Sequence, residues 1–137
     1  MSNGVINLKD SENAVGVYVE KGTVTDNVST ITVGKNGIAF YAKNSDVVLN
    51  GTIINLFGDN ALGLYLDSPS SFTGTGNINI DGQNVVLYNI VSSGATINNN
   101  FLIGTVTSGS TYSIGNLTNG EIEYTGNTSL GTNGTMM

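Results

Sequence analysis

A repeat of about 23.5 residues runs along the chain and constrains its fold more than any other feature. Each repeat contains a tyrosine within an apolar cluster, and consecutive tyrosines are separated by 23, 24, 23 and 24 residues. These residues are Tyr18, Tyr41, Tyr65, Tyr88 and Tyr112. Two more apolar positions recur with nearly the same period. One precedes each tyrosine (Ile6, Ile31, Ile54, Ile78, Leu102) and the other follows it (Val24, Val48, Phe72, Ile97, Ile122). Turn-forming runs such as Lys35-Asn36-Gly37 separate these positions, so each repeat holds three short strands and three turns.

Three strands per repeat at constant spacing predict an all-β parallel β-helix, in which each coil stacks on the preceding one at about 4.8 Å. A β-sandwich is the main alternative, but its strands need not recur at a constant interval. The chain is long enough for about five coils. We expect residues 1–137 to form a single β-helical segment of a longer protein, with residues 124–137 as an irregular C-terminal tail.

Strand alternation predicts which side chains face the core of this β-helix. In the first three tyrosine strands the alternate apolar residues are expected to face inward. They are Val15, Val17 and Val19, then Ile38, Phe40 and Ala42, then Leu62, Leu64 and Leu66. The tyrosines would then face outward. Gly16, Ala39 and Gly63, each two residues before a tyrosine, would share that face and leave the rings with bare surroundings.

The outward tyrosines are the candidate binding residues. Tyr18, Tyr41 and Tyr65 should project from consecutive coils with their rings roughly 5 Å apart. Tyr88 is expected to continue this row, although Val86 and Ile90 make its outer face unusually apolar. A stacked aromatic strip offers a large contact area at low entropic cost. The fifth tyrosine, Tyr112, is expected to turn inward, because it and Ile114 alternate with the polar or small residues Gly109, Thr111 and Ser113.

The composition fits stacked coils. Asn, Gly, Thr and Ser together make up 68 of the 137 residues, yet 39% of the chain is apolar and only 10% is charged, which argues against disorder. Stacking would place like charges in direct opposition, whereas neutral side chains can form hydrogen-bonded ladders between coils. We expect Asn27 to stack with Asn50, and Glu20, Lys43 and Asp67 to form a ladder of alternating charge.

The residue types that are missing exclude several function classes. The chain has no Cys, His or Arg, so it has neither a Ser-His-Asp or Cys-His nucleophile system nor a standard zinc site. With a net charge of −6 we expect no nucleic-acid partner. No window approaches 18 apolar residues and no signal-peptide pattern is visible, so we expect no direct membrane insertion of this segment. We expect neither a cofactor nor enzymatic activity.

The carboxylates give weaker candidates than the tyrosines. Glu121 and Glu123 share one strand face, as paired acids do in glycoside hydrolases, but the neighbouring coils offer only Thr, Asn and Gly, so we interpret them as a solvated face. Asp10, Asp59 and Asp81 lie in turns before tyrosine strands. Calcium needs six to eight oxygen ligands, so we interpret these residues as ordinary turn aspartates and predict no metal site.

Three phrases resemble the passenger repeats of large fusobacterial autotransporter adhesins. They are Asn36-Gly37-Ile38-Ala39-Phe40-Tyr41, Asn60-Ala61-Leu62-Gly63-Leu64-Tyr65 and Gly51-Thr52-Ile53-Ile54-Asn55, and the resemblance covers residues 4–100. It implies a right-handed β-helix, secretion through an outer-membrane barrel and a place at the cell surface. It further implies a stalk or display rod for adhesion to a host or bacterial surface protein or glycan.

Two further expectations concern partners and an alternative function. Uncapped coils would permit end-to-end self-association. A carbohydrate-binding or carbohydrate-degrading β-helix is the alternative, and it would need a groove with clustered acids together with basic or aromatic residues.

Overall fold

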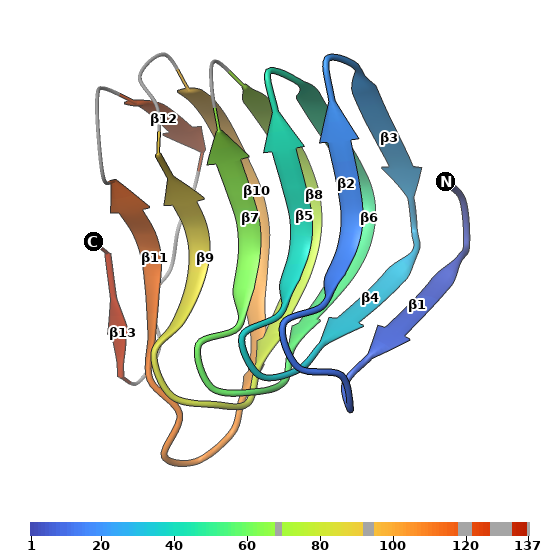
Figure 1. Ribbon diagram of the computed structural model, residues 1–137. Helices are drawn as coiled ribbons and strands as arrows, with labels where there is room; N and C mark the ends of the chain where they lie inside the picture. Colours follow the sequence, from blue (N-terminus) through green and yellow to red (C-terminus); the bar gives the residue numbers. More distant parts are fainter. Residues whose placement is uncertain (68–69, 92–94, 118–121, 127–132, 137) are drawn as a thin grey trace.

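The computed structural model describes residues 1–67, 70–91, 95–117, 122–126 and 133–136, and in this part of the chain every element is a strand (Figure 1). The strands pair in parallel and stack as a β-solenoid of about four turns, which confirms the predicted fold with about one turn fewer than expected. None of the described segments is a helix that could cross a membrane. The strands are β1 (Val5–Leu8), β2 (Val15–Glu20), β3 (Thr23–Asn27), β4 (Thr30–Val33), β5 (Ile38–Lys43), β6 (Asp46–Leu56), β7 (Leu62–Asp67), β8 (Ser71–Ile80), β9 (Val85–Ile90), β10 (Ala95–Val106), β11 (Tyr112–Leu117), β12 (Ile122–Gly126) and β13 (Gly134–Thr135).

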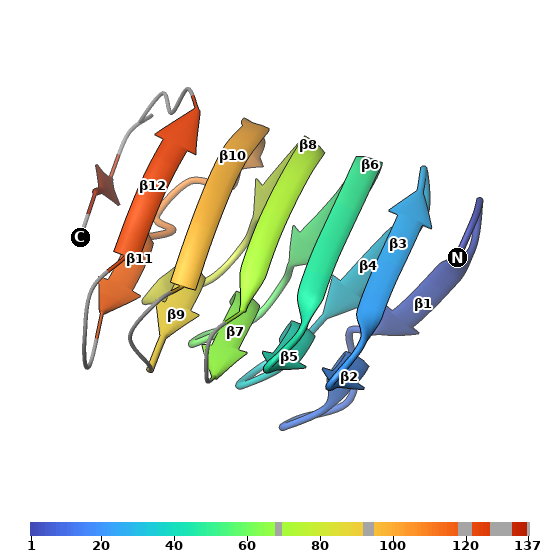
Figure 2. The ribbon, with the colours of Figure 1, turned by 90° about the horizontal axis from the view of Figure 1, so that it is seen from above.

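Two parallel sheets enclose the core. We call the sheet β1-β4-β6-β8-β10-β12, with β3 also beside β6, sheet A, and the sheet β13-β11-β9-β7-β5-β2 sheet B. Figure 2 shows β3, β6, β8, β10 and β12 side by side. The first coil has three separate strands, as predicted, but in the following coils the second and third strands merge into one long strand such as β6. This strand contains Gly51, with φ +72°, where the register with β8 shifts.

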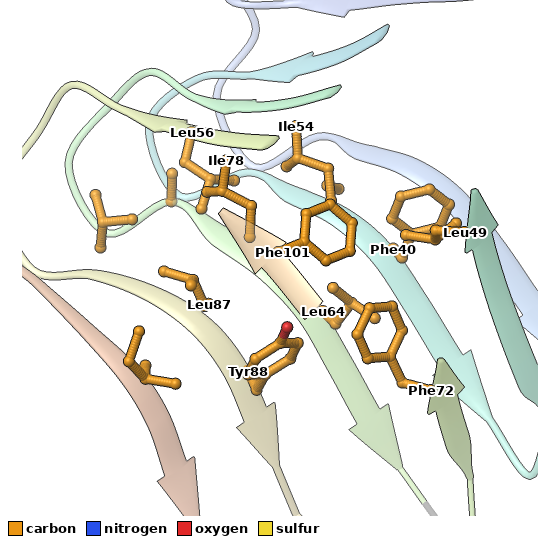
Figure 3. Close-up of a cluster of buried hydrophobic side chains, with 14 of the residues drawn as sticks. Phe40, Leu49, Ile54, Leu56, Leu64, Phe72, Ile78, Leu87, Tyr88 and Phe101 are labelled. Carbon is orange, nitrogen blue, oxygen red and sulfur yellow. The ribbon is translucent and has the colours of Figure 1, made fainter. Parts of the chain in front are cut away.

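Isoleucine, leucine and aromatic side chains, together with smaller valines and alanines, fill the space between the sheets (Figure 3). Ile6, Ile31, Ile54 and Ile78 lie in register, as predicted. The next position in this stack is Ile103, however, and the predicted Leu102 is 68% exposed.

The second apolar stack also departs from the expected residues at two places. It runs through Val24, Val47, Phe72 and Ile97, with Val47 in place of the predicted Val48, and Tyr124 rather than Ile122 pairs with Ile97. The coils differ in length, from 23 residues between Val24 and Val47 to 27 between Ile97 and Tyr124. A register change of one residue moves a side chain to the opposite face, so a constant period assigns some faces wrongly.

The strands of sheet B do not alternate strictly at their beginning. In β5, Ala39 and Phe40 are both completely buried, while Ile38 is only half-buried. In β2, a Cβ on Gly16 would lie 3.1 Å from the core residue Ile31, while Val15 is 41% exposed. The predicted inward position of Val15 and Ile38 is therefore wrong, and Gly16 and Ala39 face the core in their place.

The turns before the sheet B strands use the expected residue types. Asn13, Asn36, Asn60 and Asn84 all have φ between +55° and +60°, a left-handed conformation that asparagine tolerates better than other non-glycine residues. The N–H of Asn60 donates to the carbonyl oxygen of Gln83 (2.8 Å), so each turn also binds the next coil. In the neighbouring turn positions, a Cβ on Gly34 or Gly58 would lie 2.1 or 2.3 Å from backbone atoms of an adjacent coil, which explains the glycines there.

The C-terminal part contains more strand than the sequence predicts. β12 extends to Gly126, and β13 covers two residues of the stretch expected to be irregular. Asn133 and Met136 are described but lie outside both strands, and residues 127–132 and 137 lie outside the described residues.

Candidate functional site

Three tyrosines form a stacked row on the outside of sheet B. Tyr18 of β2, Tyr41 of β5 and Tyr65 of β7 are direct neighbours in the parallel register. The ring centroids of Tyr18 and Tyr41 are 5.1 Å apart with an interplanar angle of 30°, and those of Tyr41 and Tyr65 are 4.5 Å apart at 19°. Tyr18 is 56% exposed, and the other two side chains are half-buried. This arrangement confirms the predicted outward row for these residues, which we call the tyrosine row.

Tyr88 does not belong to this row, so its predicted outward position is wrong. Its side chain is completely buried, and its ring lies 5.4 Å from that of Phe72 within the core (Figure 3). In the register, Tyr88 pairs with Leu64, and Asn89 takes the position beside Tyr65. With Tyr88 and Ile90 buried, the Asn89 amide lies at the surface. Turning Tyr88 outward would bury this amide instead, which costs free energy because the amide loses its contact with water.

Tyr112 faces inward, as predicted. It is only 3% exposed and pairs with Val85. The aromatic row therefore covers the first three sheet B strands, and neither Tyr88 nor Tyr112 belongs to it.

A ladder of alternating charge borders the tyrosine row. Lys43 pairs with Glu20 in one neighbouring strand and with Asp67 in the other, in the predicted register. Each of these residues follows its tyrosine by two positions. The Tyr18 hydroxyl donates a hydrogen bond to Glu20 Oε2 (3.1 Å). Because Gly16 and Ala39 face the core, the expectation that small residues flank the rings is wrong. The row combines aromatic edges with charged groups of both signs.

The surroundings raise the pKa of two phenols in the row. Desolvation by its neighbours raises the pKa of Tyr18, and the Glu20 carboxylate raises it further. Burial likewise raises the pKa of Tyr41, with added contributions from Tyr65 and Asp67. Both phenols therefore lose their protons only at a higher pH than an ordinary tyrosine does.

Side-chain ladders connect coils elsewhere on the surface. Asn50 Nδ2 donates to Asn27 Oδ1 (2.9 Å), which confirms the predicted stack. A second ladder joins Thr32, Asn55 and Asn79, in which Asn55 Nδ2 donates to Thr32 Oγ1 (3.0 Å) and Asn79 Nδ2 donates to Asn55 Oδ1 (2.9 Å). These amides tie successive coils together and offer no chemistry of their own.

One buried carboxylate was missed by the sequence interpretation. Asp26 is completely buried, and its Oδ2 accepts hydrogen bonds from the Thr52 hydroxyl (2.5 Å) and the Ser29 N–H (3.1 Å). Its Oδ1 has no hydrogen-bond partner among the described residues. Strand alternation could have predicted this burial, because Asp26 lies two residues after Val24 and so shares its inward face. The contacts make Asp26 a link between the β3–β4 corner and the next coil.

The remaining acidic candidates do not form a site within the described part of the chain. Asp59 Oδ1 accepts the N–H of Gln83 (2.9 Å), which is the behaviour of a turn residue. No group of three or more His, Cys, Asp or Glu residues in the described ranges is placed to hold a metal ion. Glu121 lies outside the described residues; Glu123 pairs with Thr96 in the sheet, but its side chain is also outside the described part.

An open depression of ≈520 Å³ lies beside β9, β11 and β13. The described residues that line it are Asn84, Val85, Val86, Thr111, Tyr112, Ser113, Asn133, Gly134 and Thr135, and none of these is Asp, Glu or Lys. These described residues offer hydrogen-bonding groups from their side chains and backbone.

Neither a family model, a curated protein nor a solved structure matches this chain. The tyrosine row, its charged border and the β-solenoid that carries them are therefore the basis for any functional conclusion.

Proposed function

We propose that this chain is a structural and binding segment of a bacterial cell-surface autotransporter adhesin, in which it serves as a β-helical stalk or display rod. The observation that carries the proposal is the coil-to-coil register, which continues in sheet B from β2 through β5, β7 and β9 to β11. In a solenoid each repeat contacts its neighbours alone, so adding coils lengthens the rod without a new fold. That geometry suits a part that holds a binding surface away from the cell.

The tyrosine row is the proposed contact surface for a host or bacterial surface protein or glycan. The rings cover one another's faces at 4.5–5.1 Å, so the row presents ring edges and hydroxyls rather than flat faces. Glu20, Lys43 and Asp67 add charges of both signs beside it. Such a strip matches a partner that offers hydrogen bonds along an extended line, and tyrosine is enriched in contact surfaces of this kind.

Surface display is tested by labelling intact cells that produce the protein with antibodies raised against the purified chain. We expect labelling without permeabilisation, and we expect brief protease treatment of intact cells to remove it. Labelling that requires permeabilisation would contradict the proposed location.

Adhesion is tested with beads that carry the purified chain, applied to host cells, to other bacteria and to a glycan array. The variant Tyr18→Thr/Tyr41→Thr/Tyr65→Thr keeps strand-forming residues and removes the aromatic surface. We expect it to lose binding, with the fold intact by circular dichroism. A matched control replaces three exposed residues on sheet A by alanine, namely Thr25, Thr73 and Asn98, and should bind as the parent does. Unchanged binding by the tyrosine variant would contradict the role of the row, and release of sugars from a bound glycan would favour a carbohydrate-degrading β-helix.

A further inference from the structure

The tyrosine row brings three oxidisable phenols into contact from three different coils. Tyr41 lies between the other two, with ring-centroid distances of 5.1 Å to Tyr18 and 4.5 Å to Tyr65. These residues are 23 and 24 positions apart in sequence, so each contact joins adjacent coils. The row lies on the outside of sheet B, where a dissolved oxidant can reach it.

Other features favour oxidation at these rings. The chain has no cysteine or tryptophan to compete for an oxidant, and its three methionines are at positions 1, 136 and 137, at the ends of the sequence. The Tyr18 hydroxyl already donates to the Glu20 carboxylate at 3.1 Å, so the phenolic proton has an acceptor when the ring loses an electron. Tyr88 and Tyr112, by contrast, are enclosed in the core.

We propose that the tyrosine row is a site of oxidative cross-linking, at which Tyr41 becomes joined to Tyr65 or to Tyr18 through a carbon–carbon bond. The oxidant is a peroxide acting through a haem peroxidase. Two phenols each lose one electron and one proton. The hydrogen peroxide takes up these two electrons and two protons and becomes two water molecules. The two phenoxyl radicals couple at the carbons ortho to oxygen, and each of these carbons then loses its hydrogen as the phenol is restored.

The stacked geometry makes this coupling intramolecular. The rings are held nearly parallel at contact distance, and the broad rotation about the bond to each ring lets two edges approach. The product is a covalent link between coils that limits the freedom of the unfolded chain, as a disulfide does in other proteins. It would give a chain without cysteine a way to fasten its first three coils.

The test treats the dilute, folded chain with horseradish peroxidase and hydrogen peroxide, and follows dityrosine fluorescence and peptide masses. Cleavage after lysine separates Tyr18 from Tyr41 and both from Tyr65, so each cross-link joins two different peptides. A mixture of ¹⁵N-labelled and unlabelled chains distinguishes links within one molecule from links between molecules. We expect linked peptides of one isotope only, containing Tyr41, and a higher unfolding temperature for the treated chain.

Single substitutions provide the matched comparison. Tyr41→Phe keeps the ring but removes the shared phenol, so it should lose the cross-link, whereas Tyr18→Phe leaves the Tyr41–Tyr65 pair and should retain it. If Tyr41→Phe alters the circular dichroism spectrum, the double variant Tyr18→Phe/Tyr65→Phe replaces it in the test. This variant leaves Tyr41 without a partner phenol in the row, so it should also lose the cross-link. Dityrosine yield equal to the parent's in Tyr41→Phe or in the double variant, or links found between molecules alone, would overturn the proposal.

Discussion

The third and fourth strands of sheet B carry similar sequences but expose different residues. β7 reads Leu62-Gly63-Leu64-Tyr65-Leu66, and β9 contains Val86-Leu87-Tyr88-Asn89-Ile90 in the same register. In β7 the tyrosine lies outside and stacks on Tyr41, while in β9 the tyrosine is completely buried and Asn89 takes the outer position.

This difference shows that the face of a side chain depends on its register position and on its neighbours rather than on residue type. The inner positions of both strands hold the larger apolar groups, Leu64 and Leu66 in β7 and Tyr88 and Ile90 in β9. Tyrosine suits either place because it combines an apolar ring with one polar group. The surface row therefore ends where an asparagine replaces an aromatic residue at the outer position.

The largest expected effect comes from placing a charge at an inner position of β7. Leu64 is completely buried, so Leu64→Asp would introduce an unpaired carboxylate into the core, which costs several kcal/mol or prevents folding. Thr73→Asp, at an exposed position of β8, is the control and should change stability little. Chemical denaturation measures both. If Leu64→Asp unfolds at the same denaturant concentration as the parent, the inner face is assigned wrongly.

Truncating the two tyrosines compares the faces directly. Tyr88→Ala removes a ring packed against Phe72 and should cost about 3–5 kcal/mol, as for other large aromatic residues in cores. Tyr65→Ala removes a surface stacking contact and should cost about 0.5–1.5 kcal/mol. Equal losses of unfolding free energy in the two variants would contradict the difference between these strands.

The row should also be extendable into the fourth coil. Asn89→Tyr places a ring beside Tyr65, and we expect a gain of about 0.5–1.5 kcal/mol from the new stacking contact. Asn89→Leu removes the same amide without adding an aromatic ring, so it separates stacking from loss of the amide. Thermal unfolding of both variants measures the effect, and a tyrosine variant no more stable than the leucine variant would show that the row cannot continue.

The smallest effect concerns the charged border. Lys43→Glu would place three acidic residues in one ladder, and we expect a loss of up to about 1 kcal/mol, since exposed pairs contribute little. Because salt screens exposed charges, the loss should shrink at high ionic strength. Lys43→Gln removes the charge without reversing it, so its unfolding free energy should lie between those of the parent and of Lys43→Glu. A loss that is independent of salt would indicate that packing of the lysine side chain, rather than its charge, is what matters.

Much of the fold could be predicted because several residue types recur with the same period. Ile31, Ile54 and Ile78 identify one stack, and the pair Asn27 and Asn50 fixes a second position at the surface. Where two such signals agree, the predicted register is confirmed.

A constant period and strict alternation predict the wrong face for some side chains, because the coils are unequal in length. Leu102 follows the period, yet Ile103 occupies the stack because that coil is one residue longer than the preceding one. Ala39 and Phe40 both face the core, which alternation alone does not allow. Tyr88 could have been assigned correctly, since Ile90 and Asn89 beside it already favoured burying the tyrosine. Asp26 was missed because a carboxylate is rarely expected in a core.

Chemical modification of the tyrosines tests the central claim most directly. Nitration of the folded chain with tetranitromethane, followed by peptide mass analysis, measures the accessibility of each phenol. We predict the fastest reaction at Tyr18, which is 56% exposed, slower reaction at Tyr41 and Tyr65, and protection of Tyr88 and Tyr112 until the chain unfolds. Modification of Tyr88 at the rate of Tyr65 in the folded protein would contradict the assignment of a three-residue row on a β-solenoid surface.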